Sequence, residues 1–356
     1  MKKVGHTDET RDRGRAESES EHILAIAATS GGLDSLLAAE VIRRAGIGVT
    51  LLHVQHLFSA GEAGRAQLRR TADRYGFNLR IEDASEAHLE TIRRPKHGYG
   101  RGMNPCVDCR IFMLRIAKRV MEEEGAQFVA TGEVLGQRPK SQHLKALQSA
   151  ADESGLGDRL VRPLSANLLP ETLPVRAGWL SKDDLYAIQG RSREPQMALA
   201  AEFGIEHYPQ PAGGCMLIER TYAERVRDAF RHQGRDEVDL AAFKLLQIGR
   251  HFRISDSVKA IVGRNRHENE ALEDFAEGRI RLEPKDVMGP TTLVEGSPSG
   301  EEMVLAAALT ARYCDATDSV AFTVHGIDGV TSIEVDQLSP DDPRIADWRI
   351  GDESSS

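Results

Sequence analysis

The feature that most constrains the fold is an alternation of two patterns in the first third of the chain. Four short apolar stretches predict strands, at residues 22–30, 49–56, 78–84 and 126–133. Three stretches between them have helical spacing, at residues 36–46, 62–75 and 106–124. Strands that alternate with helices of this length form a parallel sheet with helices on both faces. We therefore predict an α/β domain that binds its ligand beyond the carboxyl ends of the strands.

The rest of the chain is less regular. Three prolines between residues 161 and 178 break any long element. From about residue 240 a strand pair, followed by a helix that Gly278 ends, predicts a smaller α+β domain. The predicted organisation is a disordered leader, an α/β domain, the α+β domain and a mobile acidic tail, at residues 1–21, 22–235, 240–335 and 336–356.

The composition indicates in which cellular compartment the protein is expected. Four cysteines in 356 residues are too few for a disulfide scaffold. The opening residues lack the apolar segment of a secretion signal, and the apolar run ILAIAA is far shorter than the roughly 20 residues of a membrane-spanning helix. We expect a soluble cytoplasmic protein without membrane association. The net charge is −9, but residues 60–145 are mildly basic, which leaves a nucleic-acid partner open beside an ordinary surface of mixed charge.

The sequence TSGGLDS stands between the first predicted strand and the helix that follows it. Backbone N–H groups and the helix dipole make such a turn an anion site. Gly31 and Gly32 allow the backbone to approach a phosphate closely, and the hydroxyls of Ser30 and Ser35 add donors. The bland alternative is a tight turn in which Asp34 caps the helix.

The complete string resembles the SGGxDS signature of the PP-loop ATP pyrophosphatase superfamily. The resemblance implies a HUP-type fold, like that of the adenine nucleotide alpha hydrolases, and cleavage of ATP between its α and β phosphates. It implies that the turn holds the departing pyrophosphate while AMP is placed on a carbonyl oxygen of the substrate. Asp34 would position Mg²⁺ or act near the reacting centre. The residues implied to bind the cofactor here are Ser30, Gly31, Gly32, Asp34 and Ser35.

A second string, TGEVLGQRPKSQ, resembles the GE-x-x-x-Q-x-x-SQ stretch of ThiI and related tRNA thiolation enzymes. The matching residues are Gly132, Glu133, Gln137, Ser141 and Gln142. The resemblance places Gly132, with Gln137 and Ser141, against the nucleotide. The Pro139–Lys140 pair departs from the family pattern and is expected to reshape the loop. The alternative is a strand followed by a capped polar loop.

Two cysteines, Cys106 and Cys109, lie three residues apart where a helix is predicted to begin. Asn104 as N-cap and Pro105 at the first helical position signal that start. In the first turn the helix dipole favours thiolates, and residues three apart share a face. Such a pair can chelate a metal, carry a persulfide, form a redox couple or simply pack in the core.

A third cysteine, Cys215, lies in the Gly-rich stretch QPAGGCM. Together with Cys106 and Cys109 it resembles the arrangement of iron-sulfur-dependent tRNA thiolases of the TtuA and TtcA types. The resemblance implies that the three sulfurs hold a [4Fe–4S] cluster with one iron open to sulfide. A persulfide relay between Cys106 and Cys215 is one rival. The other is a zinc site completed by a histidine, for which His97 and His207 are nearby in sequence.

Other reactive side chains have plainer interpretations. His53 and His56 alternate along the second predicted strand and are expected to be packing residues. Cys314 is expected to be a core or surface thiol.

Within the smaller domain, the stretch VGRNRHEN resembles the NFACT-R RNA-binding module. An ordinary solvated hairpin face is the alternative. Five cations of this region are candidates for RNA phosphate contacts: Arg250, Arg253, Lys259, Arg264 and Arg266.

Taken together, the motifs resemble an ATP-dependent tRNA sulfurtransferase. ATP and Mg²⁺ would occupy the glycine turn, a uridine carbonyl would be adenylated, and sulfur delivered at Cys106, Cys109 and Cys215 would displace AMP to leave thiouridine. The expected partners are tRNA and a sulfur donor, either sulfide or a sulfur-carrier protein. The alternatives are a zinc-containing PP-loop ligase that forms an amide or nitrile on a small molecule, and a non-catalytic RNA-binding factor. The sequence leaves the oligomeric state, the modified uridine and the C2 or C4 position undetermined.

Overall fold

The computed structural model describes residues 23–351 except residues 60, 209–214, 317 and 327–328. The chain divides into two compact units. Unit 1 comprises residues up to 100 and 105–213, and unit 2 comprises residues 101–104 and those from 214 onward. The predicted leader, residues 1–21, lies outside the described residues.

Unit 1 is built on a five-stranded parallel sheet, with strand order β3-β2-β1-β4-β5. The strands are β1 Leu24–Ala28, β2 Gly48–Gln55, β3 Asn78–Asp83, β4 Phe128–Thr131 and β5 Leu160–Val161. Strand order reverses beside β1, which has β2 on one side and β4 on the other. The crevice outside such a reversal is the usual ligand position in open α/β sheets. The glycine turn follows β1 and the TGE string ends β4, so both motifs lie at this point.

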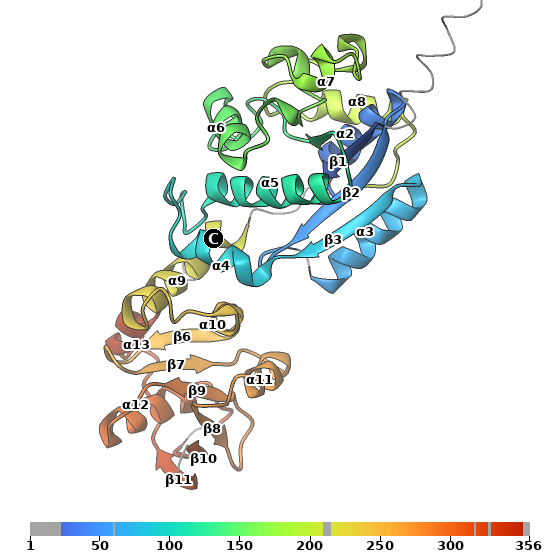
Figure 1. The fold of residues 1–356 in the computed structure, drawn as a ribbon. Coiled ribbons are helices and arrows are strands. Elements are labelled where there is room, and N and C mark those ends of the chain that lie inside the picture. The colour runs from blue at the N-terminus through green and yellow to red at the C-terminus, as the bar shows by residue number, and fades with distance from the viewer. Residues whose placement is uncertain (1–22, 60, 209–214, 317, 327–328, 352–356) are drawn as a thin grey trace, which may run out of the picture. The chain divides into compact units, whose positions relative to one another are not determined.

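Helices cover both faces of this sheet (Figure 1). They are α2 Leu33–Arg44, α3 Glu62–Tyr75, α4 Ser85–Arg93, α5 Cys106–Glu123, α6 Leu144–Ser154, α7 Leu173–Arg176 and α8 Glu194–Glu202, with 3₁₀ turns η1 Gly157–Arg159, η2 Ala166–Leu168 and η3 Lys182–Asp184. Residues of α2, α3 and α8 share one apolar cluster with the sheet, and α5 and α6 share the cluster of the other face. Strand residues alternate between the two clusters, as the pleat requires: Ala25 and Ala27 face α2, whereas Ile26 faces α5.

Unit 2 has a six-stranded antiparallel sheet, with strand order β11-β10-β8-β9-β7-β6. Its strands are β6 Arg250–Arg253, β7 Lys259–Val262, β8 Ile280–Pro284, β9 Thr292–Glu295, β10 Val320–Gly326 and β11 Gly329–Val335. Its helices are η4 Met216–Ile218, α9 Arg220–His232, α10 Leu240–Leu245, α11 Arg266–Glu273, α12 Gly300–Ala311 and α13 Pro343–Trp348. The alanine-rich face of α12 packs into the core of the sheet.

The predicted fold class is confirmed: a parallel sheet with helices on both faces, and a separate α+β unit. The division of the chain differs from the predicted boundary near 235–240, because unit 2 begins at residue 214 and also includes residues 101–104. The described part of the predicted tail differs too. It forms α13, and Leu338 and Ile345 are buried in the unit 2 core. The helices that the sequence analysis did not predict are α4, α6 and α7 in unit 1 and α9, α10, α12 and α13 in unit 2.

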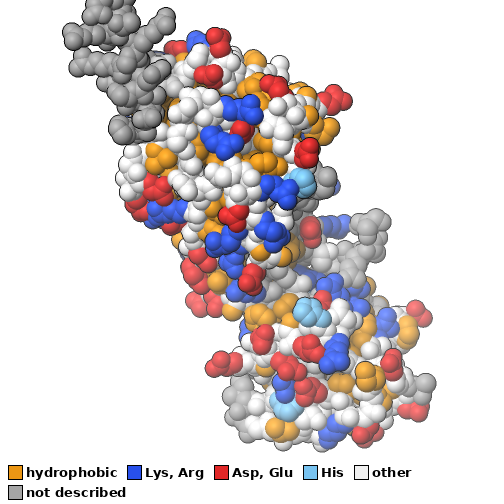
Figure 2. Space-filling model, turned by 90° about the vertical axis from the view of Figure 1, so that its right-hand side faces the viewer, with side chains coloured by type: hydrophobic (Ala, Val, Ile, Leu, Met, Phe, Trp, Pro, Cys, Tyr) orange, Lys and Arg blue, Asp and Glu red, His pale blue; other side chains and the backbone are white. Residues whose placement is uncertain are grey.

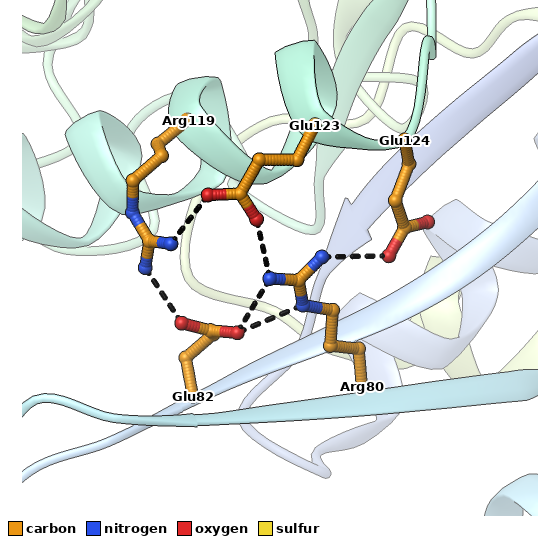
Figure 3. Close-up of polar contacts among 5 residues, drawn as sticks. All are labelled: Arg80, Glu82, Arg119, Glu123 and Glu124. Carbon is orange, nitrogen blue, oxygen red and sulfur yellow. Dashed lines mark hydrogen bonds and ion pairs between the residues drawn. The ribbon is translucent and has the colours of Figure 1, made fainter.

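An ion-pair network joins β3 to the last turns of α5 (Figure 3). Its members are Arg80, Glu82, Arg119, Glu123 and Glu124. Arg119 bridges Glu82 on the strand and Glu123 on its own helix at 2.6 and 2.7 Å. The two arginines hold the pKa values of Glu82 and Glu123 below their usual range, chiefly through hydrogen bonds from Arg119. The network fixes the end of α5 that is farther from its cysteines.

No helix in the described residues combines the length and the apolar character that a bilayer crossing requires. On the face shown in Figure 2, Lys and Arg side chains lie among Asp and Glu side chains in each unit.

A buried charge cluster stabilises unit 2. The Lys259 side chain is 2% exposed, and its Nζ lies 2.7 Å from Glu295, which also pairs with Arg279 at 2.9 Å. Burial would raise the pKa of Glu295, but the charges of Lys259 and Arg279 outweigh that effect and lower it. Lys259 therefore has a structural role, and the prediction that it contacts RNA phosphates is wrong.

Replacing Glu295 by Gln should lower the free energy of unfolding of unit 2 by about 3 kcal/mol, because a buried lysine loses its charge partner. Urea unfolding measured by tryptophan fluorescence tests this in a Trp179→Phe background, where Trp348 of unit 2 is the remaining tryptophan. Arg266→Ala is the control, since its side chain is 92% exposed. Equal midpoints for Glu295→Gln and the control would contradict the prediction.

Candidate functional site at the carboxyl ends of β1 and β4

The glycine turn is held by its own side chains. The Thr29 hydroxyl accepts a hydrogen bond from the N–H of Gly31 at 3.0 Å and lies 2.9 Å from the Ser35 hydroxyl. The Ser35 hydroxyl donates to the carbonyl of Gly32 at 2.8 Å. Gly31 has φ +81°, in the left-handed region that glycine adopts without strain. The Ser35 hydroxyl therefore donates its proton within the turn and has none left to donate to a ligand. Thr29 also holds the turn, a role that the sequence motif did not indicate.

The N-terminus of α2 is open to an anion. Its N-cap is Gly32, and within the described residues no side chain caps it. Ser30 is exposed beside it. The unpaired N–H groups of a helix's first turn carry a partial positive charge. The backbone of the turn, together with the Ser30 hydroxyl, therefore offers the donors that a phosphate requires.

Gly132 makes the closest approach between the two motifs. A Cβ built on Gly132 would lie 2.4 Å from the carbonyl carbon and oxygen of Asp34 and 2.5 Å from the nitrogen of Ser35. Only glycine permits the end of β4 to contact the backbone of α2 in this way. The structure gives Gly132 a packing role, and its predicted contact with a nucleotide stays a prediction.

The carboxylate of Asp34 contacts two side chains that are distant in sequence, those of Gln137 and Arg193. Gln137 Nε2 donates to Asp34 Oδ2 at 3.0 Å, and Arg193 lies 3.8 Å from Asp34 Oδ1. Asp34 Oδ1 is buried and has no hydrogen-bond partner among the described residues. A buried carboxylate oxygen beside an anion site fits a divalent cation such as Mg²⁺, which binds through one or two carboxylates plus phosphate. Arg193, the N-cap residue of α8, carries no sequence signal for this position.

The loop that carries Gln137 is held mainly by backbone hydrogen bonds. The N–H of Gly136 donates to the carbonyl of Gln142 at 2.7 Å. The N–H of Leu135 donates to the Ser165 hydroxyl at 3.0 Å. Ser141 lies in this loop and is 8% exposed. The predicted contact of Ser141 with a nucleotide stays a prediction.

Glu133 is buried between two arginines. Its side chain is 1% exposed, and its carboxylate lies 3.0 Å from Arg162 Nε and 3.3 Å from Arg110 Nη1. The Thr131 hydroxyl donates to it at 3.2 Å. Burial would raise the pKa of Glu133, but Arg110 and Arg162 together lower it below its usual value. Since Arg110 is the residue after Cys109, this pairing fixes the start of α5 against the end of β4.

The cysteine-bearing helix begins at Cys106, with Pro105 as N-cap. The prediction of Asn104 as N-cap is wrong, because the Asn104 side chain instead accepts the N–H of Gly102. Asp108 of the first turn accepts the N–H groups of Lys96 and His97 at 2.9 and 3.0 Å, and so holds the preceding loop. Cys106 and Cys109 are each half-buried.

His88, on α4, lies against Cys109. Its Nε2 atom is 3.2 Å from Cys109 Sγ, and its side chain is almost completely buried. Its ring contacts the rings of His56 and Phe112, with centroids 4.7 and 5.3 Å apart. Burial, reinforced by His56, lowers the pKa of His88 to about 3, and burial, reinforced by His53, lowers the pKa of His56 to about 4. Both imidazoles are therefore neutral at pH 7.

His53 lies on β2, and His56 directly follows this strand. The carbonyl of Thr29 can only accept, so His53 donates its Nδ1–H to it at 3.0 Å. The N–H of Phe58 donates to His56 Nδ1 at 3.3 Å. Both residues pack as expected, whereas the contact of His88 with Cys109 was missed because α4 itself was not predicted.

The third predicted cysteine, Cys215, belongs to unit 2. It directly precedes η4 and is half-buried. Among the described residues no group of three or more His, Cys, Asp or Glu side chains is arranged to hold a metal ion. Joint ligation by Cys106, Cys109 and Cys215 therefore stays a prediction. Cys314 is buried in unit 2, where burial raises the pKa of its thiol to about 11, which fits the predicted core thiol.

Unit 1 also contains a cavity of about 360 Å³. Residues of α6, β5, η2 and α7 line it, together with Arg162. None of the predicted site residues is among its lining residues. The chemical groups described above therefore define the candidate site, and the cavity does not.

Comparison with known proteins agrees with these motifs. Residues 20–166 match the family model of the thiamine biosynthesis protein ThiI, and residues 249–349 match that of the NFACT protein RNA-binding domain. The predicted resemblance to ThiI-type and NFACT-R-type domains is confirmed.

Individual relatives cover parts of the chain. A tRNA-specific 2-thiouridylase MnmA from Azorhizobium caulinodans is 30% identical over 246 residues, which are 64% of this chain and 59% of that protein. A probable tRNA sulfurtransferase from Thermus thermophilus is 32% identical over 133 residues, 35% of this chain and 32% of that protein. The chain thus spans about three fifths of the length of the MnmA relative. The solved U34-tRNA thiolase NcsA from Methanococcus maripaludis aligns over 64% of this chain and 73% of that chain, at 15% identity and a TM-score of 0.32.

Gly132→Ala should destabilise unit 1 by at least about 2 kcal/mol, because the new methyl group would overlap the backbone at Asp34 and force β4 and α2 apart. Gly61→Ala is the matched control, since a Cβ there has nothing within 4 Å and its φ is −59°. Thermal unfolding of the two variants measures the difference. A melting temperature for Gly132→Ala equal to that of the control would refute the close approach.

Glu133→Gln should lower the free energy of unfolding of unit 1 by about 3 kcal/mol at pH 7, since it leaves two arginines near an uncharged amide. The folded-state pKa of Glu133 is lowered, so its contribution is present above the usual pKa of about 4.3 and is lost as the pH falls through the folded-state value. The difference between wild type and variant should therefore shrink on acidification below pH 4. Urea unfolding reported by Trp179, in a Trp348→Phe background, measures it. A difference that does not depend on pH would contradict the assignment.

Proposed function

We propose that this protein is an ATP-dependent tRNA sulfurtransferase that activates a uridine carbonyl by adenylation and replaces its oxygen with sulfur. The observation that carries the proposal is the junction at Gly132. There the glycine turn, with its uncapped helix N-terminus, and the GE-x-x-x-Q-x-x-SQ loop meet at Asp34. The ThiI family match and the thiouridylase relatives support the same chemistry.

Adenylation is needed because a uracil carbonyl oxygen is a very poor leaving group. The turn at Ser30–Gly32 would bind the β and γ phosphates through backbone N–H groups and the α2 dipole. Asp34 would hold Mg²⁺ through its buried Oδ1, and Arg193 would add a positive charge next to the phosphates. These groups would stabilise the negative charge that develops on the departing pyrophosphate.

The sulfur would be delivered at Cys106, Cys109 and Cys215. A [4Fe–4S] cluster, when bound, would present an iron to which external sulfide can attach. Cys106 and Cys109, in the first turn of α5, would supply two ligands of such a group, and Cys215 of unit 2 would supply the third.

Unit 2 would bind the tRNA through its phosphates. Of the five cations predicted for this role, Arg266 and Arg264 keep substantial exposure, at 92% and 40% of the side chain. Arg253 forms a two-point ion pair with Asp228, and Arg250 stacks on Tyr313 at 4.8 Å. The match to the NFACT RNA-binding domain supports this role for the unit.

The test is in vitro thiolation with purified chain, ATP, Mg²⁺, sulfide and unmodified tRNA transcript. Wild type should release pyrophosphate when RNA is added and yield a thionucleoside by mass spectrometry. Asp34→Asn should slow pyrophosphate release by roughly 100-fold, since a ligand of the phosphate-bound cation is lost. Cys109→Ser should keep RNA-dependent pyrophosphate release but yield no thionucleoside.

Other outcomes separate the rivals. Pyrophosphate release with a small carboxylic acid in place of RNA, and zinc without iron or labile sulfide, would identify a ligase instead. No pyrophosphate release with any RNA would favour a binding factor. Thiolation that persists in Asp34→Asn would remove Asp34 from the reaction.

A further inference from the structure

The strongest unassigned feature outside the motifs is the side chain of His88. It is a polar side chain, 1% exposed, with one ring nitrogen 3.2 Å from the sulfur of Cys109. Its other ring nitrogen, Nδ1, is buried and has no hydrogen-bond partner among the described residues. The rings of His56, Phe58 and Phe112 pack around the imidazole, with centroids 4.7, 6.5 and 5.3 Å away.

The neutral imidazole has one N–H, and the surroundings decide which nitrogen carries it. A proton on Nδ1 would leave a buried N–H without an acceptor. Buried N–H groups that lack a partner are rarer in proteins than unpaired acceptors. A proton on Nε2 instead finds the sulfur of Cys109 at hydrogen-bonding distance and leaves only a lone pair unpaired at Nδ1.

We propose that His88 is a positioning residue that donates its Nε2–H to Cys109 Sγ and fixes the direction in which this sulfur presents itself. The aromatic packing around the ring orients the imidazole, and the hydrogen bond then orients the sulfur. Groups that orient a sulfur or metal ligand from behind in this way typically change affinity or activity by 10- to 100-fold when they are removed.

The same contact distinguishes the two cysteines of the first turn. Cys106 and Cys109 share one helix, but His88 contacts Cys109. Arg110, the next residue, is held by the buried carboxylate of Glu133. Two contacts therefore fix the position of Cys109: the imidazole of His88 at its sulfur, and the ion pair of Arg110, the next residue, with Glu133. This suits a sulfur that has to stay in place during the proposed reaction.

The hydrogen bond can be tested without any metal or substrate. Histidine ring ¹⁵N spectra of the metal-free full chain report the tautomer of each histidine, and the loss of one signal in His88→Gln assigns His88. His88 should carry its proton on Nε2, and its Nε2 signal should move in Cys109→Ala but not in the matched variant Cys106→Ala. An Nδ1–H tautomer, or equal shifts in both cysteine variants, would overturn the proposal.

The positioning role has a separate test, which rests on the proposed function. In His88→Gln the amide nitrogen can still donate near the Nε2 position, whereas His88→Phe keeps a ring but has no donor. Thionucleoside formation should fall about 10-fold or more in His88→Phe and be largely restored in His88→Gln, with RNA-dependent pyrophosphate release unchanged in both. Equal losses in the two variants would refute positioning. If wild type forms no thionucleoside, the proposed function fails, and the spectra alone decide the hydrogen bond.

Discussion

One buried carboxylate, that of Glu133, holds the site in unit 1 together. Glu133 directly follows Gly132, the glycine that allows β4 to contact α2. Its carboxylate pairs with Arg162, which directly follows β5, and with Arg110, which directly follows Cys109. A charge with 1% exposure is tolerated because two cations face it, and the cations in turn depend on it. The spacing between the glycine turn and the cysteine-bearing helix therefore rests on an electrostatic contact, to which apolar packing of α5 on the sheet is added.

Within the turn, structural and chemical roles fall to different atoms. The hydroxyls of Thr29 and Ser35 form hydrogen bonds that hold the backbone of the turn. The groups that remain for a ligand are the backbone N–H groups of the helix start, the exposed Ser30 and the unpaired oxygen of Asp34. A turn whose shape is set by its own hydrogen bonds is preorganised, so the proposed binding of a phosphate would require little reorganisation. The GE-x-x-x-Q-x-x-SQ loop contacts this turn through Gln137, which donates a hydrogen bond to Asp34.

The sequence predicted what is local and missed what is brought together over long distances. Apart from α4, the strands and helices of the first 131 residues are close to their predicted bounds, because the apolar periodicity and the glycines at element ends can be recognised from neighbouring residues. His88, Arg193 and Arg162 carry no motif, and only the folded sheet brings them to Cys109, Asp34 and Glu133. The prediction for Lys259 was wrong because the sequence alone does not distinguish a lysine that is buried against a glutamate from one that contacts a phosphate.

The two-unit organisation suits a reaction on a large folded RNA. Unit 1 carries the phosphate turn and two cysteines, and unit 2 carries the NFACT-R-type fold and Cys215. In the proposed reaction, an RNA bound by unit 2 would be tethered to the same chain as the phosphate turn, so weak phosphate contacts could give a high effective concentration without a large interface. Arg253 and Lys259 pair with Asp228 and Glu295, so they stabilise unit 2 itself, and an RNA contact would depend on more exposed cations such as Arg266.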